Sequence, residues 1–162
     1  MNDEREVNLD RMRFIKNTTS SRLALLAIFF DVLFFVSIYK SDVGNFYYNI
    51  LIGASIIYNL VFLLAAFLAS EGVKNYKQSF SWVMIVLGII QIVRIFILPV
   101  KAHSTTLTVG GVETLVMGNG QFVRVVIYLL LSAACLFASA VINLNKSRML
   151  AAHVASLEAN RA

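Results

Sequence analysis

Four long apolar stretches follow one another along the chain, separated by shorter polar segments. We predict membrane-spanning helices over 21–39, 46–70, 80–98 and 122–144. Each stretch is close to the roughly 20 residues that an α-helix needs to cross the hydrocarbon core of a bilayer. The predicted fold class is an all-α membrane protein, an antiparallel bundle of four transmembrane helices that forms one domain over 1–162.

Within these spans, polar and small residues recur three or four positions apart, which places them on one face of a helix. We expect these faces to point toward the other helices rather than toward lipid. The predicted inward faces are Ala24, Ala27, Asp31, Phe34 and Ile38 in the first span, Ile52, Ser55, Asn59, Phe62 and Ala66 in the second, and Met84, Gly88, Gln91, Arg94 and Leu98 in the third.

The middle of the first span carries Asp31, the one acidic residue within any predicted span. A charge at the bilayer centre costs roughly 2.5–3.5 kcal/mol on insertion scales, so such a residue normally faces other helices or water. With alternate spans antiparallel, Asn59 and Gln91 come to a similar depth, Arg94 lies nearer the outer end and Arg124 nearer still. We therefore predict a buried polar cluster of these five residues, in which Asp31 pairs with Arg94.

Three interpretations of this intramembrane polar cluster remain open. It can be a structural clasp that fixes which helix lies beside which. It can serve transport, with Asp31 binding a proton or a cation. It can also be completed by another subunit, with a membrane charge neutralised across an interface. Comparing Asp31→Asn with Arg94→Gln for stability and for ion flux distinguishes the first interpretation from the second.

The longest connection, 101–121, has two segments rich in Thr, Val and Leu, 105–109 and 112–117, on either side of Gly110-Gly111. A glycine pair between such segments is typical of a tight two-residue turn. We predict a small extracytoplasmic β-hairpin there, between the third and fourth spans.

Both ends of the chain are charged and mildly amphipathic. The segment 1–20 is expected either to lie on the membrane as an interfacial helix or to remain a solvated tail. The tail 145–162 places Leu150, Val154 and Leu157 on one stripe, which predicts a helix that continues the fourth span or bends away from it.

Composition supports a membrane location, with 59% hydrophobic residues and a net charge of +5. The basic residues flank the apolar stretches, so we read them as topology signals and contacts to anionic lipid and predict no nucleic-acid partner. They gather on one side of the predicted bundle, which predicts a multi-pass cell-membrane protein with both termini cytoplasmic. That side carries Arg5, Arg11, Arg13, Lys16, Arg22, Lys74, Lys77, Lys146, Arg148 and Arg161, against Lys40 and Lys101 on the other.

The fourth span is the richest in small residues, which suit close approach of another helix. We predict Ala134 and Ala138 as helix-packing residues and expect Leu at either position to disrupt an oligomer. The partners expected are the lipid bilayer and either a second copy of the chain or another membrane protein.

Residues that would carry catalysis are not found in a recognisable arrangement. The chain has one cysteine, Cys135, and two separate histidines, His103 and His153, which do not suggest a metal site. We therefore predict no enzyme, no metal and no cofactor. The favoured function is that of a membrane protein that self-associates or serves as a subunit or accessory of a membrane complex. The alternative is a small oligomeric transporter or channel that uses Asp31 as its proton or cation site.

Overall fold

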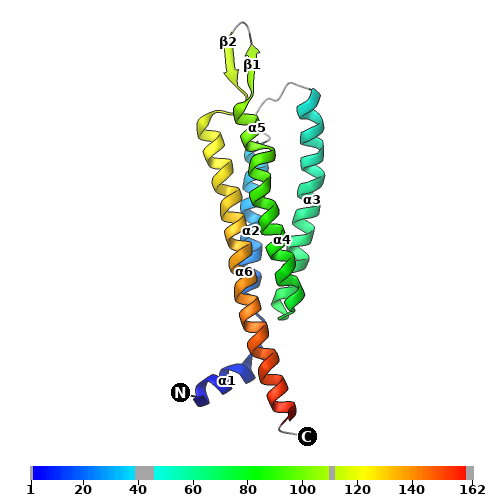
Figure 1. Cartoon of the computed structure of the whole chain (residues 1–162), viewed down its shortest axis with the longest axis vertical. Coiled ribbons are helices and arrows are strands. Elements are labelled where there is room, and N and C mark those ends of the chain that lie inside the picture. Colours follow the sequence, from blue (N-terminus) through cyan, green and yellow to red (C-terminus); the bar gives the residue numbers. More distant parts are fainter. Residues whose placement is uncertain (1, 39–45, 110–111, 160–162) are drawn as a thin grey trace.

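The computed structural model describes residues 2–38, 46–109 and 112–159 of the chain (Figure 1). Its elements are α1 (Asn2–Met12), α2 (Thr18–Ile38), α3 (Phe46–Lys74), α4 (Gln78–Ile97), α5 (Pro99–Ser104), β1 (Thr106–Val109), β2 (Val112–Leu115) and α6 (Asn119–Ala159).

Four of the helical segments are long and apolar enough to cross a membrane, namely 18–38, 53–74, 78–104 and 119–159. This fits a multi-pass membrane protein. Helix α6 packs against α2 and α4, and α3 packs against the same two helices. The four helices therefore form a closed ring around one central axis, with α2 and α4 at opposite corners (Figure 1).

The inward faces expected from helical spacing are confirmed for the residues whose burial is described, with the exception of Leu98. Every predicted inward residue of α2 is buried, as are Ser55, Asn59, Phe62 and Ala66 of α3. Leu98 is only partly buried, and the side chain of Ile52 lies outside the described part. Two apolar clusters fill the bundle, one around Phe62, Met84 and Leu136 and the other around Phe34, Val125 and Leu129.

The predicted fold class needs a correction in the segment 101–121, because a single hairpin does not cover it. Residues up to Ser104 belong to the short helix α5, and antiparallel pairing is confined to two four-residue strands, β1 with β2. Pro99 follows the end of α4. It occupies the first turn of α5, where its missing N–H is tolerated. The pairing adds no sheet layer to the helical bundle, and Gly110-Gly111 lies outside the described residues.

The last helix is longer than predicted, since α6 contains 41 residues in one unbroken helix. At a rise of 1.5 Å per residue it is about 60 Å long, roughly twice the hydrocarbon thickness of a bilayer. Its C-terminal part projects beyond the other long helices, at the end where α1 lies (Figure 1). The segment 145–159 thus continues the fourth span rather than bending away from it.

Candidate functional site

The centre of the bundle contains a buried ion pair between α2 and α4. Nη1 of Arg94 donates a hydrogen bond to Oδ1 of Asp31 over 2.8 Å. The Asp31 side chain is fully buried and the Arg94 side chain is 6% exposed. Because water cannot screen these charges, each must be compensated by the other. The predicted pairing is confirmed, and it lies within a single chain.

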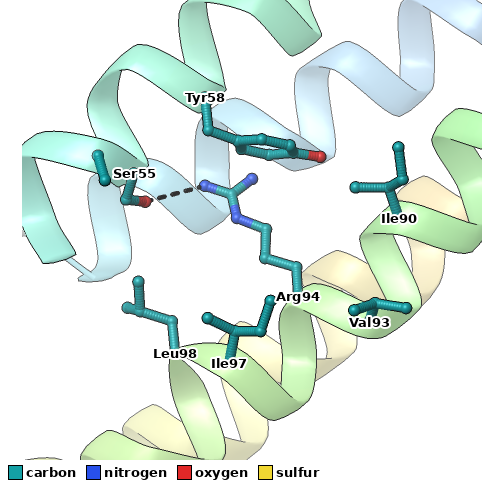
Figure 2. Close-up of a pocket in the computed structure, with 8 residues that line it drawn as sticks. Ser55, Tyr58, Ile90, Val93, Arg94, Ile97 and Leu98 are labelled. Atoms are coloured by element: carbon teal, nitrogen blue, oxygen red, sulfur yellow. Dashed lines mark hydrogen bonds between the residues drawn. The ribbon is translucent and has the colours of Figure 1, made fainter.

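The guanidinium of Arg94 also reaches α3. Its Nη2 donates to Oδ1 of Asn59 and lies 3.4 Å from Oγ of Ser55 (Figure 2). Aromatic rings flank the same group, with its central carbon 4.3 Å from the ring centroid of Phe34 and 4.7 Å from that of Tyr58. A cation near ring faces in a dry site gains about 2 kcal/mol or more. Arg94 is thus held by three kinds of contact at once.

Helix α6 joins the cluster through Ser132, which is bonded to Gln91 of α4. Nε2 of Gln91 donates to Oδ1 of Asp31 over 2.8 Å and to Oγ of Ser132 over 3.3 Å. Oγ of Ser132 in turn donates to the backbone carbonyl of Ala27 over 3.0 Å. The cluster therefore joins α2, α3, α4 and α6 at one level of the bundle.

Three buried polar atoms of this region have no hydrogen-bond partner among the described residues. They are Oδ2 of Asp31, Oε1 of Gln91 and the hydroxyl of Tyr58. A buried polar group without a partner typically costs 1–3 kcal/mol. Asp31 and Gln91 can therefore each accept a further hydrogen bond, and the hydroxyl of Tyr58 can donate one.

A groove between α3 and α4 leads from the lipid-facing surface toward the cluster. It holds about 210 Å³ and is lined by side chains that are mostly aliphatic, such as Ile90 and Ile97. Ser55, Tyr58 and Arg94 also line it (Figure 2), but the surface that the groove exposes is almost entirely apolar.

One predicted feature of α6 requires correction. Arg124 is exposed and does not join the polar cluster. It lies on the outward face of α6, because a rotation of about 100° per residue separates it from its buried neighbour Val125. Ala134 and Ala138 are exposed on this same face, so they stay available for a contact with another helix in the membrane. The intrachain contacts of α6 use residues such as Ala133 and Ala140 instead.

A second buried polar layer, which the sequence did not single out, lies at the end of the bundle near α1. The side chains of Asn17 and Asn143 are joined by a 3.0 Å hydrogen bond, and Asn143 donates to Oγ of Ser81 over 2.7 Å. Ser20 and Ser139 exchange bonds to each other's backbone carbonyls, over 3.1 and 2.7 Å. The one available signal was the recurrence of Ser and Asn at these helix ends.

The described residues hold no group of three His, Cys, Asp or Glu side chains placed to share a metal ion. His103 contacts the backbone carbonyl of Met117 at 3.0 Å and stacks on Phe122. His153 lies on α6, beside Asp10 of α1. The chemistry that the arrangement offers is therefore hydrogen bonding and charge pairing.

Comparison of the chain with protein-family models, with curated proteins and with solved structures gave no match. Its function is therefore inferred from its own residues and their geometry.

Proposed function

We propose that this chain is a non-catalytic membrane protein that works by associating with a second copy of itself through the outward face of α6. The observation that carries this proposal is the exposure of Ala134 and Ala138, four residues apart, on that face. Small residues at this spacing allow two helices in a bilayer to approach closely.

The composition of the outward face supports this role. Arg124, Ala134, Ala138, Asn145 and Arg148 are all exposed on it, with the polar residues toward the ends and the small ones in the middle. Large exposed side chains such as those of Ile127 and Val141 flank these small residues on the same face, and the other spans expose mostly large side chains such as those of Val61, Leu64 and Phe96. The small-residue region of α6 is therefore the part of this surface that suits a helix–helix contact better than a lipid contact.

Two copies in one membrane must pair with their α6 helices parallel. Contacts between small residues favour a crossing of about −40°, so the helices diverge on both sides of the contact. Arg124 lies ten residues before Ala134, which is roughly 15 Å along the helix axis. At that distance the divergence keeps the two Arg124 side chains apart. The charge inside each copy is already balanced by Asp31 and Arg94, so self-association needs no partner of opposite charge.

The proposed location is the cell membrane, with both chain ends in the cytoplasm. The support is the excess of Lys and Arg in 1–22, 74–77 and 146–161 over the remaining connections. Helix α1 and the C-terminal end of α6 lie at the same end of the bundle (Figure 1), as this orientation requires.

Cysteine crosslinking in native membranes tests the self-association. With Cys135→Ala as background, Ala138→Cys should form an oxidised dimer of about twice 18.0 kDa, because the two side chains face each other across the contact. Val61→Cys on α3 is the matched control, since Val61 is 61% exposed on another lipid-facing helix, and it should remain monomeric. Equal crosslinking of both variants, or a crosslink of Ala138→Cys to another protein without any dimer, would refute self-association.

A second candidate function is transport of a proton or a cation through Asp31. The observation that favours it is the buried Oδ2 of that carboxylate, which has no hydrogen-bond partner in the part of the chain that the structure describes. Vesicles containing the purified protein should then show a flux that Asp31→Asn abolishes and that Arg124→Gln leaves intact. The absence of flux for protons and for monovalent and divalent cations would exclude this candidate and leave the cluster as a clasp.

A further inference from the structure

A second groove lies where α1 meets the bundle, away from the polar cluster. It holds about 270 Å³ and is bounded by the end of α1, the turn between α3 and α4, and Leu150 of α6. Three cationic side chains line it, those of Arg13, Lys16 and Lys74. Its lining thus has the charge that an anion requires.

Backbone and side-chain bonds join the two segments that carry Lys16 and Lys74. The backbone N–H of Asn17 donates to the carbonyl of Lys74 over 2.9 Å, which ties the residue after Lys16 to the end of α3. The buried side chain of Asn17 bonds to Asn143 of α6 over 3.0 Å. Lys16 and Lys74 therefore project from two segments that are fixed to each other, and their spacing is a property of the fold.

Carboxylates balance the positive charge only in part. Glu71 pairs with Lys74 at 2.8 Å, and Asp10 lies 3.8 Å from Arg13. Lys16 is exposed at the rim of the groove. Tyr76 also lines the groove, and burial raises its pKa above the ordinary value of 10.0, so its hydroxyl is protonated at neutral pH and can donate a hydrogen bond.

The groove lies at one end of the candidate membrane-spanning segments. Most of its residues come from the two short connections that flank the spanning segments, before Thr18 and between Lys74 and Gln78. Beside the cations, Phe14 is 85% exposed and Ile15 is 59% exposed. Large apolar side chains next to basic ones, just outside the ends of transmembrane helices, are typical of segments that enter the membrane interface.

We propose that this groove binds the phosphate of an anionic membrane phospholipid, with Phe14 and Ile15 inserted among the acyl chains beside it. Lys16, Lys74 and Arg13 supply the positive charge, and the tied junction between α1, α3 and α6 supplies the shape. Basic pockets between transmembrane helices bind anionic headgroups on the same principle. This site does not depend on the self-association proposed above.

The full-length protein in mixed vesicles of phosphatidylcholine and phosphatidylglycerol tests the proposal. After extraction, native mass spectrometry counts the lipids that stay bound, and phosphatidylglycerol should be enriched over its share in the vesicle. In Lys16→Gln/Lys74→Gln the enrichment should fall by about tenfold, because a basic residue near a lipid surface contributes close to fivefold in affinity and Glu71 weakens the share of Lys74. Lys16→Arg/Lys74→Arg should retain it.

The matched control is Arg22→Gln/Lys101→Gln, which removes the same charge at exposed positions outside the groove and should keep the enrichment. An equal loss in this control, or no enrichment in the unmodified protein, would overturn the proposal.

Inorganic phosphate added to phosphatidylcholine vesicles separates the two sources of phosphate. The measurement here is the melting temperature of the protein. If inorganic phosphate raises it as much as phosphatidylglycerol does, the groove is a free-anion site and lipid binding is refuted. The single variant Lys16→Gln, at an exposed position, repeats the comparison if the double variant unfolds.

Discussion

Nη1 of Arg94 lies 2.8 Å from Oδ1 of Asp31, a residue 63 positions earlier in the chain. The bond joins α2 and α4, which occupy opposite corners of the four-helix ring and each pack against α3 and α6. A contact across the diagonal constrains all four helices at once, because neither α2 nor α4 can rotate without breaking it. The ion pair therefore fixes the rotation of the helices as well as their neighbours.

Asp31→Asn should destabilise the protein by about 3–5 kcal/mol, because it leaves the guanidinium of Arg94 buried without a counter-charge. Arg94→Gln should cost a similar amount for the converse reason. Reversible unfolding in mixed detergent measures both values. The exposed Arg124 provides the control, and Arg124→Gln should stay within about 0.5 kcal/mol of the unmodified protein.

The double variant Asp31→Asn/Arg94→Gln should lose much less than the sum of the two single changes, since it removes both charges together. A coupling energy of about 1–3 kcal/mol is expected for groups in one buried network. Additive losses would mean that the two side chains act independently, contrary to the geometry of the cluster.

The sequence predicted the inward faces of the first three spans because periodicity is a strong signal in apolar helices. Long hydrophobic runs are interrupted by Asp31, Asn59, Gln91 and Arg94. Because a polar side chain in such a run is costly to expose to lipid, it normally faces the bundle interior. Their depths could be compared from the antiparallel order of the spans alone. The pairing of Asp31 with Arg94 followed from the requirement of charge balance.

The features of α6 were harder to predict. Small residues occur on several faces of this helix, and helical spacing alone does not tell which face meets α2 and α4 and which meets lipid. Arg124 was assigned to the cluster by its depth, whereas its rotation about the axis turns it outward. The roles of Phe34 and Tyr58 beside Arg94 were missed because aromatic residues are common throughout membrane helices.

Gly72→Ala should destabilise the bundle, since the added Cβ would lie 2.2 Å from ring atoms of Phe80. The close approach of α3 to the start of α4 depends on the absence of a side chain at this position. Forcing the ring aside typically costs 1–3 kcal/mol. Thermal unfolding in detergent measures the change.

Gly53→Ala in the same helix is the matched control, because a Cβ at Gly53 would meet nothing within 4 Å. Alanine is the better helix former by roughly 0.5–1 kcal/mol, so this variant should be as stable as the unmodified protein or more stable. Equal destabilisation by both substitutions would mean that the contact with Phe80 is not the cause.

Asn143→Ala should lower stability by about 2–3 kcal/mol, at close to 1 kcal/mol for each hydrogen bond removed. The Asn143 amide donates to the backbone carbonyl of Lys77 over 3.1 Å and to Oγ of Ser81 over 2.7 Å, and it accepts from Asn17 over 3.0 Å. These bonds tie the starts of α2 and α4 to α6. Asn145→Ala, at an exposed position two residues further on, should change stability by less than about 0.5 kcal/mol. Similar losses in chemical unfolding for both variants would contradict the role of the buried amide.

The contact between α1 and α6 should weaken in acid. Oδ1 of Asp10 lies 3.0 Å from Nε2 of His153, and this hydrogen bond holds the pKa of Asp10 below its ordinary value of 3.8. A lowered pKa means that the ionised carboxylate favours the docked state. Its contribution is therefore complete above pH 3.8 and is lost as the pH falls through the lowered value.

Spin labels on α1 and α6 measure this release directly. With Cys135→Ala as background, labels at Val7→Cys and Ala155→Cys should give a short, narrow distance distribution near neutral pH that broadens in the acid range below pH 3.8. Asp10→Asn should give a broader distribution already at neutral pH and no further change in that range, because it lacks the titrating group. A wild-type distribution that stays narrow throughout, or an acid transition that persists in Asp10→Asn, would show that this pair does not control the docking of α1.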